Sequence, residues 1–113
     1  MRTWVSQLRK GVTELIVLAA LHRGEAYGYE LLERINQYEG LGLSESMVYP
    51  LLARLKRDQL VRVRAAPSPS GPPRRYYRLT ASGQRRLAEM LEHWRTLGSA
   101  VDQLVKENRD ECH

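Results

Sequence analysis

The period at which apolar residues recur changes twice along this chain. From residue 13 to residue 59 they recur every three or four positions, as they do on amphipathic helices. The period becomes two in LVRVR at residues 60–64, and the aromatic and basic RRYYRL at 74–79 follows across the turn-rich AAPSPSGPP. From Thr80 onward the helical period returns. These changes predict a mainly α protein of the α+β class, with the order helix, helix, helix, hairpin and long helix.

Capping residues and glycines divide the first part of the chain into helical segments. Thr13 is a suitable N-cap for TELIVLAALHRG, and His22 followed by Gly24 is a typical helix stop. The apolar residues of this segment surround the helix almost completely, which predicts a place at the centre of the core. The next segment, YGYELLERINQYEG, carries its leucines and isoleucine on one face and ends where Gly40 and Gly42 break the chain.

The third helical segment, SESMVYPLLARLKRDQL at residues 44–60, contains a proline. With Ser44 as N-cap, Pro50 falls in the second turn, where its missing N–H costs less than the roughly 3 kcal/mol expected in a helix interior. A rotation of about 100° per residue gives the segment two sides. The apolar side holds Val48, Leu51, Leu52, Leu55 and Gln59. The other side, which we expect to be exposed, holds Ser46, Tyr49, Pro50, Ala53 and Arg57.

Positive charge is concentrated in the middle of the chain. The 113 residues together have a formal net charge of +5. Residues 44–86 hold ten basic and two acidic residues, a net charge of +8, whereas residues 1–43 are neutral and residues 87–113 hold three basic and six acidic residues. A basic block of this kind is typical of a surface that faces a polyanion, although a solvated, solubilising face would have the same composition.

The order of the elements favours DNA as the polyanion. Two helices followed by a third helix and a basic ribbon have the order of a winged helix, in which the exposed N-terminal part of the recognition helix enters the major groove. Hydroxyl side chains at that end can contact bases or phosphates, and the basic side chains beside them neutralise phosphates. The residues predicted to contact double-stranded DNA are Ser44, Ser46, Tyr49, Ala53, Arg54, Lys56, Arg57, Arg74, Arg75 and Tyr76.

The C-terminal helical segment, for which Thr80 is the expected N-cap, carries an apolar stripe over more than four turns. Its members are Leu87, Met90, Leu91, Trp94, Leu97, Val101 and Val105. Exposing such a stripe to water costs about 25 cal/mol per Å2, and three short helices and a ribbon cannot cover its far end. We therefore expect a second copy of the chain to cover it in a homodimer. The alternative is that the helix folds back on its own core.

Three blocks of the sequence resemble the PadR family of bacterial transcriptional regulators. They are GEAYGYELLERI at residues 24–35, VYPLLARLKRDQLV at 48–61 and GPPRRYYRLTASG at 71–83. The likeness spans about residues 12–105, with the blocks in one order and at one spacing. The chain departs from the family pattern at Met47, where the family usually has serine or threonine, and at Gln59, where it has glycine.

The resemblance implies a winged-helix DNA-binding domain at residues 1–79 and a dimerisation helix at 80–113. It implies a dimeric repressor that binds a pseudo-palindromic operator and is released by a small-molecule effector. In short members of the family the partner's N-terminal helix packs on the long helix, which implies interface roles for Trp4 and Leu8. Some short members stack planar drugs on a tryptophan in the segment matching EHWRTL, so the resemblance implies that Trp94 contacts a planar aromatic effector. The alternative for Trp94 is plain interface packing.

The sequence gives no sign of catalytic chemistry. No catalytic constellation or phosphate-binding glycine loop is apparent, so neither an enzyme nor a cofactor is expected. The terminal ECH at 111–113 has no partner cluster, which argues against a metal site, and the single cysteine, Cys112, excludes an internal disulfide. No apolar run approaches the roughly 20 residues of a membrane span, and a cytoplasmic location is expected. Two other functions stay open, a small-molecule sensor and a dimeric protein-interaction adaptor, in both of which DNA binding is secondary or lost.

Overall fold

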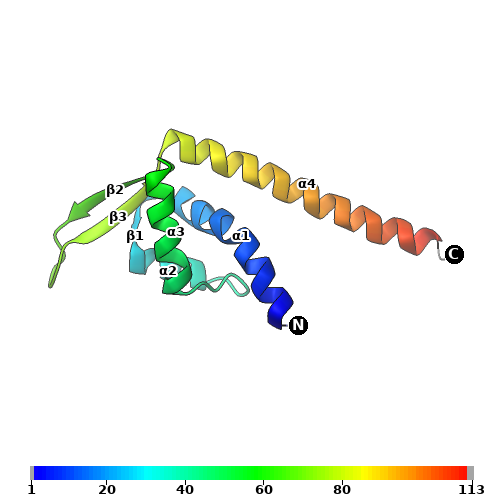
Figure 1. Ribbon diagram of the computed structural model, residues 1–113, viewed down its shortest axis with the longest axis horizontal. Coiled ribbons are helices and arrows are strands. Elements are labelled where there is room, and N and C mark those ends of the chain that lie inside the picture. The colour runs from blue at the N-terminus through cyan, green and yellow to red at the C-terminus, as the bar shows by residue number, and fades with distance from the viewer. Residues whose placement is uncertain (1, 112–113) are drawn as a thin grey trace.

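The computed structural model describes residues 2–111 (Figure 1). The elements are α1 (Arg2–His22), β1 (Ala26–Tyr27), α2 (Gly28–Asn36), α3 (Glu45–Arg57), β2 (Val61–Ala66), β3 (Arg74–Leu79) and α4 (Ala81–Glu111). A mainly helical chain with a small antiparallel sheet confirms the expected fold class. The wing, formed by β2, β3 and their connection, and the far end of α4 project from opposite ends of a molecule 65 Å long (Figure 1).

The first helix is longer than the sequence predicted. Thr13 was expected to cap its start, but α1 begins eleven residues earlier and passes through Thr13 without a break. The Thr13 side chain is buried, and its hydroxyl donates to the carbonyl oxygen of Arg9 at 2.6 Å. A threonine that bonds back to the preceding turn satisfies its hydroxyl inside a helix, so the expected N-cap was wrong.

The sheet has three strands in the order β1-β3-β2, all antiparallel. The sequence predicted only the β2–β3 hairpin, because a strand of two residues carries no alternating pattern. In the register of the sheet, Tyr77 lies opposite Val63 on one side and Ala26 on the other, whereas Tyr76 lies opposite Arg64 and Tyr27. Tyr77 is buried against the helices, and Tyr76 therefore belongs to the outer face of the sheet.

The core forms where α1, α2 and α3 meet the inner face of the sheet. Its fully buried side chains include Val17 and Leu18 of α1, Leu31 of α2, and Leu52 and Leu55 of α3. On α3 the expected division into two sides is confirmed for all residues within the helix: the buried ones are Val48, Leu51, Leu52 and Leu55, and the exposed ones are Ser46, Tyr49, Pro50, Ala53 and Arg57.

Gln59 departs from this division. It was expected on the apolar side of the third helix, but α3 ends at Arg57 and Gln59 lies exposed in the turn that follows. Its φ of 61° is in the left-handed region, which favours glycine. This conformation lets the chain reverse from α3 into β2, and it explains why glycine suits the position in the family that the chain resembles.

The last helix starts against the sheet and then leaves the core. The hydroxyl of Thr80 accepts from the backbone N–H of Gly83 at 3.0 Å, so Thr80 is the N-cap, as predicted. Leu87 has only 4% of its surface exposed and packs in the chain's own core, with Met90 and Leu91 half-buried beside it. Leu87 was expected in a dimer interface and is instead a core residue. The described side chains from Glu92 to Glu107 are all exposed.

Among residues 2–111, no helix has both the length and the apolar character needed to cross a membrane.

Candidate nucleic-acid interface

The N-terminal end of α3 presents small polar side chains to solvent. Ser44 is the N-cap residue, and its carbonyl oxygen accepts from the N–H groups of Met47 and Val48 at 3.1 Å. The hydroxyls of Ser44 and Ser46 lie 2.8 Å apart and bond to each other rather than to the helix backbone. Both serines are exposed, so their hydroxyls can exchange this bond for one to an external acceptor.

Tyr49 belongs to the exposed side of α3, and its ring packs on the start of α2. Its side chain is 40% exposed, and its ring covers Gly28: a Cβ placed on Gly28 would lie 2.5 Å from the Tyr49 hydroxyl oxygen. Partial burial of the phenol, together with the nearby Glu45 carboxylate, raises the pKa of Tyr49. The hydroxyl therefore stays protonated at neutral pH and can donate a hydrogen bond.

A surface hollow of about 360 Å3 lies between α2, α3 and β3. Four tyrosines, two arginines and a glycine line it: Tyr27, Gly28, Tyr29, Tyr49, Arg74, Arg75 and Tyr77. The fold thus brings Tyr49 of the third helix together with the arginines predicted in the wing. Tyr29, which is 60% exposed at the start of α2, was not among the predicted contacts. Its signal in the sequence was an aromatic residue on the polar side of a helix whose apolar side is complete without it.

The basic residues at the C-terminal end of α3 differ in whether they form ion pairs within the chain. Arg54 donates to the carboxylate of Glu14 on α1 at 3.0 Å, and Arg86 of α4 lies 3.8 Å from the same carboxylate. Arg57 lies 3.6 Å from Asp58. Lys56 is exposed, and no ion pair involves it among the described residues. The Glu14 carboxylate thus links Arg54 of α3 and Arg86 of α4 to α1. Four of the five N–H donors of Arg54 are not used in its bond to Glu14.

The strand period divides the predicted wing residues between the two faces of the sheet. Arg75 lies on the same face as Tyr77, which is the face toward α3. Arg74 and Tyr76 lie on the outer face with Arg64 and Tyr27, where aromatic rings and guanidinium groups stack. The Arg64 guanidinium is 4.6 Å from the centre of the Tyr76 ring, the Arg74 guanidinium is 4.3 Å from that of Tyr27, and the two rings pack edge to face at 5.5 Å.

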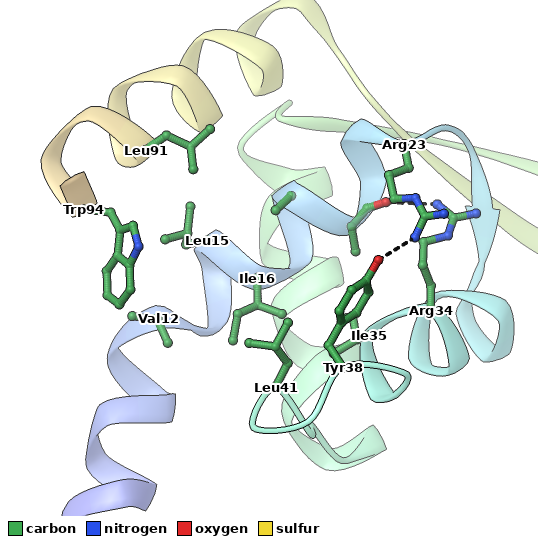
Figure 2. A pocket seen from close by; sticks show the side chains of 12 residues that line it. Val12, Leu15, Ile16, Arg23, Arg34, Ile35, Tyr38, Leu41, Leu91 and Trp94 are labelled. Atoms are coloured by element: carbon green, nitrogen blue, oxygen red, sulfur yellow. Dashed lines mark hydrogen bonds between the residues drawn. The ribbon is translucent and has the colours of Figure 1, made fainter. Parts of the chain in front are cut away.

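A second hollow is lined mainly by apolar side chains, with Arg23, Arg34 and Tyr38 at one end (Figure 2). It has a volume of about 380 Å3 and lies between α1, α2, the loop that follows α2, and α4. Trp94 and Leu91 of α4 close one end against Val12 and Leu15 of α1 (Figure 2). At the other end an Arg23 N–H donates to the hydroxyl of Tyr38 at 3.2 Å. The Trp94 residue is 47% exposed, so it is only partly covered by α1.

The remaining predicted interface residues share one property, which is exposure. Trp4 and Leu8 on α1, and Leu97, Val101 and Val105 on α4, are each between 44% and 62% exposed. Leu104, at 67%, is a further exposed leucine that the predicted stripe omitted because it lies at the margin of that stripe. Cys112 and His113, considered above for metal binding, lie outside the described residues.

The fold is that of a winged-helix protein: α2 and α3 are followed by the β2–β3 ribbon, and α3 exposes a polar side. The long helix α4 is added at the C-terminal end. Residues 17–89 match the model of the transcriptional regulator PadR-like family. The chain belongs to this family, whose members are transcriptional regulators rather than enzymes.

Solved structures of other family members support this assignment. A PadR family transcriptional regulator from Eggerthella lenta is 34% identical, with a TM-score of 0.82 over 92% of this chain and 90% of the other. A PadR-like transcriptional regulator from Bacillus cereus is also 34% identical, with a TM-score of 0.77 over 88% and 96%. Bacillus subtilis PadR, solved in complex with operator DNA, is 26% identical, with a TM-score of 0.66 over 71% of this chain and 45% of the other.

Proposed function

We propose that this chain is a homodimeric transcriptional repressor that binds operator DNA through α3 and the wing. The observation that carries the proposal is the hollow between α2, α3 and β3, where the exposed side of a recognition helix meets Arg74 and Arg75. The chain's similarity to Bacillus subtilis PadR, which was solved with operator DNA, supports the same conclusion. In this arrangement Ser46 and Tyr49 contact the major groove, and Arg75, Lys56 and the free donors of Arg54 contact phosphates.

The hydroxyl of Tyr49 offers a selective test, because the ring also packs on Gly28. Tyr49→Phe keeps the ring and removes only the donor. We expect it to weaken binding to DNA from upstream of the protein's own gene about tenfold, or about 1.4 kcal/mol, with non-specific binding unchanged. Fluorescence anisotropy on labelled duplexes measures both affinities. Equal binding by wild type and Tyr49→Phe would make Tyr49 a packing residue only.

Charge neutralisation by the wing is tested separately. Arg75→Gln should reduce the slope of log K against log salt by about 0.9, the contribution of one phosphate. Arg95→Gln removes an exposed charge on α4, which contributes no residue to the hollow beside Tyr49. This variant should leave the slope unchanged. If wild type itself showed no salt-dependent binding to any duplex, DNA binding would be rejected, and the sensor or adaptor functions would be favoured.

The homodimer follows from the uncovered apolar surface of α1 and α4. Trp4 and Leu8 near the start of α1, and the aliphatic residues of α4 beyond Trp94, are exposed. Nothing within residues 2–111 covers them. Packing α4 of each copy against α1 and α4 of the other would bury them and place two winged-helix units about a two-fold axis, as a pseudo-palindromic operator requires. Residues 1–79 would then supply DNA binding and residues beyond Trp94 the interface.

The apolar hollow at Trp94 is the site we propose for an effector. Its volume of about 380 Å3 lies within the range of small-molecule sites, and Trp94, which lines it and is partly exposed, can stack on a planar aromatic molecule. Bound ligand would alter the seating of α4 on α1 and hence the separation of the winged units. In a Trp4→Phe background, planar dyes should quench the fluorescence of Trp94, and Trp94→Ala should abolish binding. Affinity that survives Trp94→Ala would rule out this site.

A further inference from the structure

The outer face of the sheet carries a second concentration of positive charge. Because side chains alternate along a strand, this face receives Arg62 and Arg64 from β2 and Arg74 and Arg78 from β3. Tyr77 and Arg75 point to the opposite face, toward α3. Arg74 also lines the hollow beside Tyr49 of the recognition helix. The other three, Arg62, Arg64 and Arg78, line a separate surface on the side of the sheet that faces away from this helix.

Two of these arginines are directly opposed. Arg62 of β2 pairs with Arg78 of β3 in the register of the sheet, and both side chains are exposed. Like charges directly opposite one another on an antiparallel sheet destabilise it. An arrangement that lowers stability without a partner is typical of a functional surface.

Glu25, the acidic residue beside Arg62 and Arg78 in the described part of the chain, already pairs with another arginine. Both carboxylate oxygens of Glu25 accept from Arg64, at 2.7 and 2.9 Å, and this bidentate bond is the main cause of the lowered pKa of Glu25. Arg64 is also stacked on Tyr76. Within the part of the chain that the structure describes, no ion pair involves Arg62 or Arg78.

These arginines border a surface hollow of about 310 Å3. Its lining consists of Glu25, Arg62, Val63, Arg64 and Arg78. Two unpaired guanidinium groups at the edge of a hollow, each with five N–H donors, suit a tetrahedral oxyanion that can accept bonds from both. A bound anion would also remove the repulsion between the two arginines.

We propose that Arg62 and Arg78 form a phosphate-binding site on the outer face of the sheet, separate from the surface that reads the operator. The phosphate group has two possible sources, the backbone of duplex DNA that continues past the wing and a free phosphate. The DNA source rests on the DNA-binding function proposed above, whereas the free-phosphate source does not.

The test uses the full-length double variant Arg62→Gln with Arg78→Gln and two duplexes. One duplex is trimmed to the protected footprint, and the other is extended at each end by about ten base pairs, one helical turn. We expect the variant to bind the trimmed duplex as wild type does and to lose about 0.9 from the salt slope on the extended duplex. Arg85→Gln, which removes one exposed charge from α4, should not alter either slope.

A thermal unfolding series in inorganic phosphate, matched in ionic strength with chloride, gives the second readout. Phosphate stabilises proteins generally, so the measured quantity is the stabilisation of wild type minus that of the double variant.

A positive difference without a change on the extended duplex assigns the site to free phosphate. An equal loss of slope on both duplexes would place the pair in the operator-reading surface and overturn the proposal. No change in either readout would also overturn it. Failure of wild type to bind the trimmed duplex would reject the operator function and leave the phosphate series to decide.

Discussion

Gln59 has a left-handed backbone conformation, which costs free energy in any residue that has a Cβ. Its φ of 61° allows α3 to end and the chain to enter β2, and the Gln59 carbonyl oxygen accepts from the Thr80 hydroxyl at 2.8 Å. The side chain itself is exposed. The position therefore depends on the backbone, and its amino acid is free to change if the replacement tolerates the left-handed region.

Replacing Gln59 with glycine should stabilise the protein. The left-handed conformation costs a residue with a Cβ roughly 1–2 kcal/mol, of which the greater freedom of glycine in the unfolded chain offsets a part. We expect Gln59→Gly to raise the free energy of unfolding in urea by about 0.5–1 kcal/mol, with no change in the m-value. Gln59→Ala keeps the strain and serves as the control. A glycine variant no more stable than the alanine variant would contradict the strain argument.

At the scale of the elements, the junction between the sheet and α4 is held by close contact. Gly83, in the first turn of α4, lies so near the carbonyl oxygen of Leu60 that a Cβ there would overlap it. The N–H of Thr80 donates to that same carbonyl at 3.1 Å, and the Thr80 hydroxyl caps the helix. These contacts fix the direction in which α4 leaves the sheet and hence the position of Leu87 in the core.

Gly83→Ala should therefore be destabilising, although alanine is the better helix former. The methyl group meets a backbone atom that cannot rotate away, so we expect a loss of about 1–3 kcal/mol in the free energy of unfolding. Gly11→Ala is the matched control: nothing lies within 4 Å of its added Cβ, so it should gain up to about 1 kcal/mol from helix propensity. A gain in stability for both variants would contradict the close contact between Gly83 and the Leu60 carbonyl oxygen.

For the whole molecule, the question is what covers α4 beyond the core. Helix α4 is 31 residues long, and Leu97, Val101, Leu104 and Val105 are each about half exposed or more. An apolar row on a projecting helix is stable in water when a second copy packs against it. The winged-helix units would then be spaced by the geometry of this interface.

Charges placed in the row should separate the copies. The double variant Leu97→Glu with Val101→Glu is expected to sediment as a monomer at micromolar concentration, because four carboxylates would be buried together in the dimer. Both positions lie beyond the last half-buried contact of α4, so the fold should be retained in circular dichroism. Ser99→Glu adds a charge on the opposite side of the helix, two residues from each of Leu97 and Val101, and should stay dimeric. Wild type that sedimented as a monomer would reject the dimer altogether.

Local patterns in the sequence determined much of this protein. The change of period located the helices and the hairpin, and the apolar spacing of residues 44–57 separated the buried from the exposed side of α3, because neighbours three and four apart share one side of a helix whatever surrounds it. The exposed position of Pro50 was predictable for the same reason. The capping role of Thr80 was predictable because a threonine side chain before a helical pattern can accept from the N–H three residues ahead.

Only the tertiary structure decided which distant groups meet. It placed Leu87 in the chain's own core, paired Arg54 with Glu14 forty residues away, and set Tyr49 over Gly28. It also added β1, which is too short to have a period, and decided which face of the wing lies against the helices. Strand register and helix direction fix these contacts, and both arise from packing across the whole molecule rather than from the order of residues within one segment.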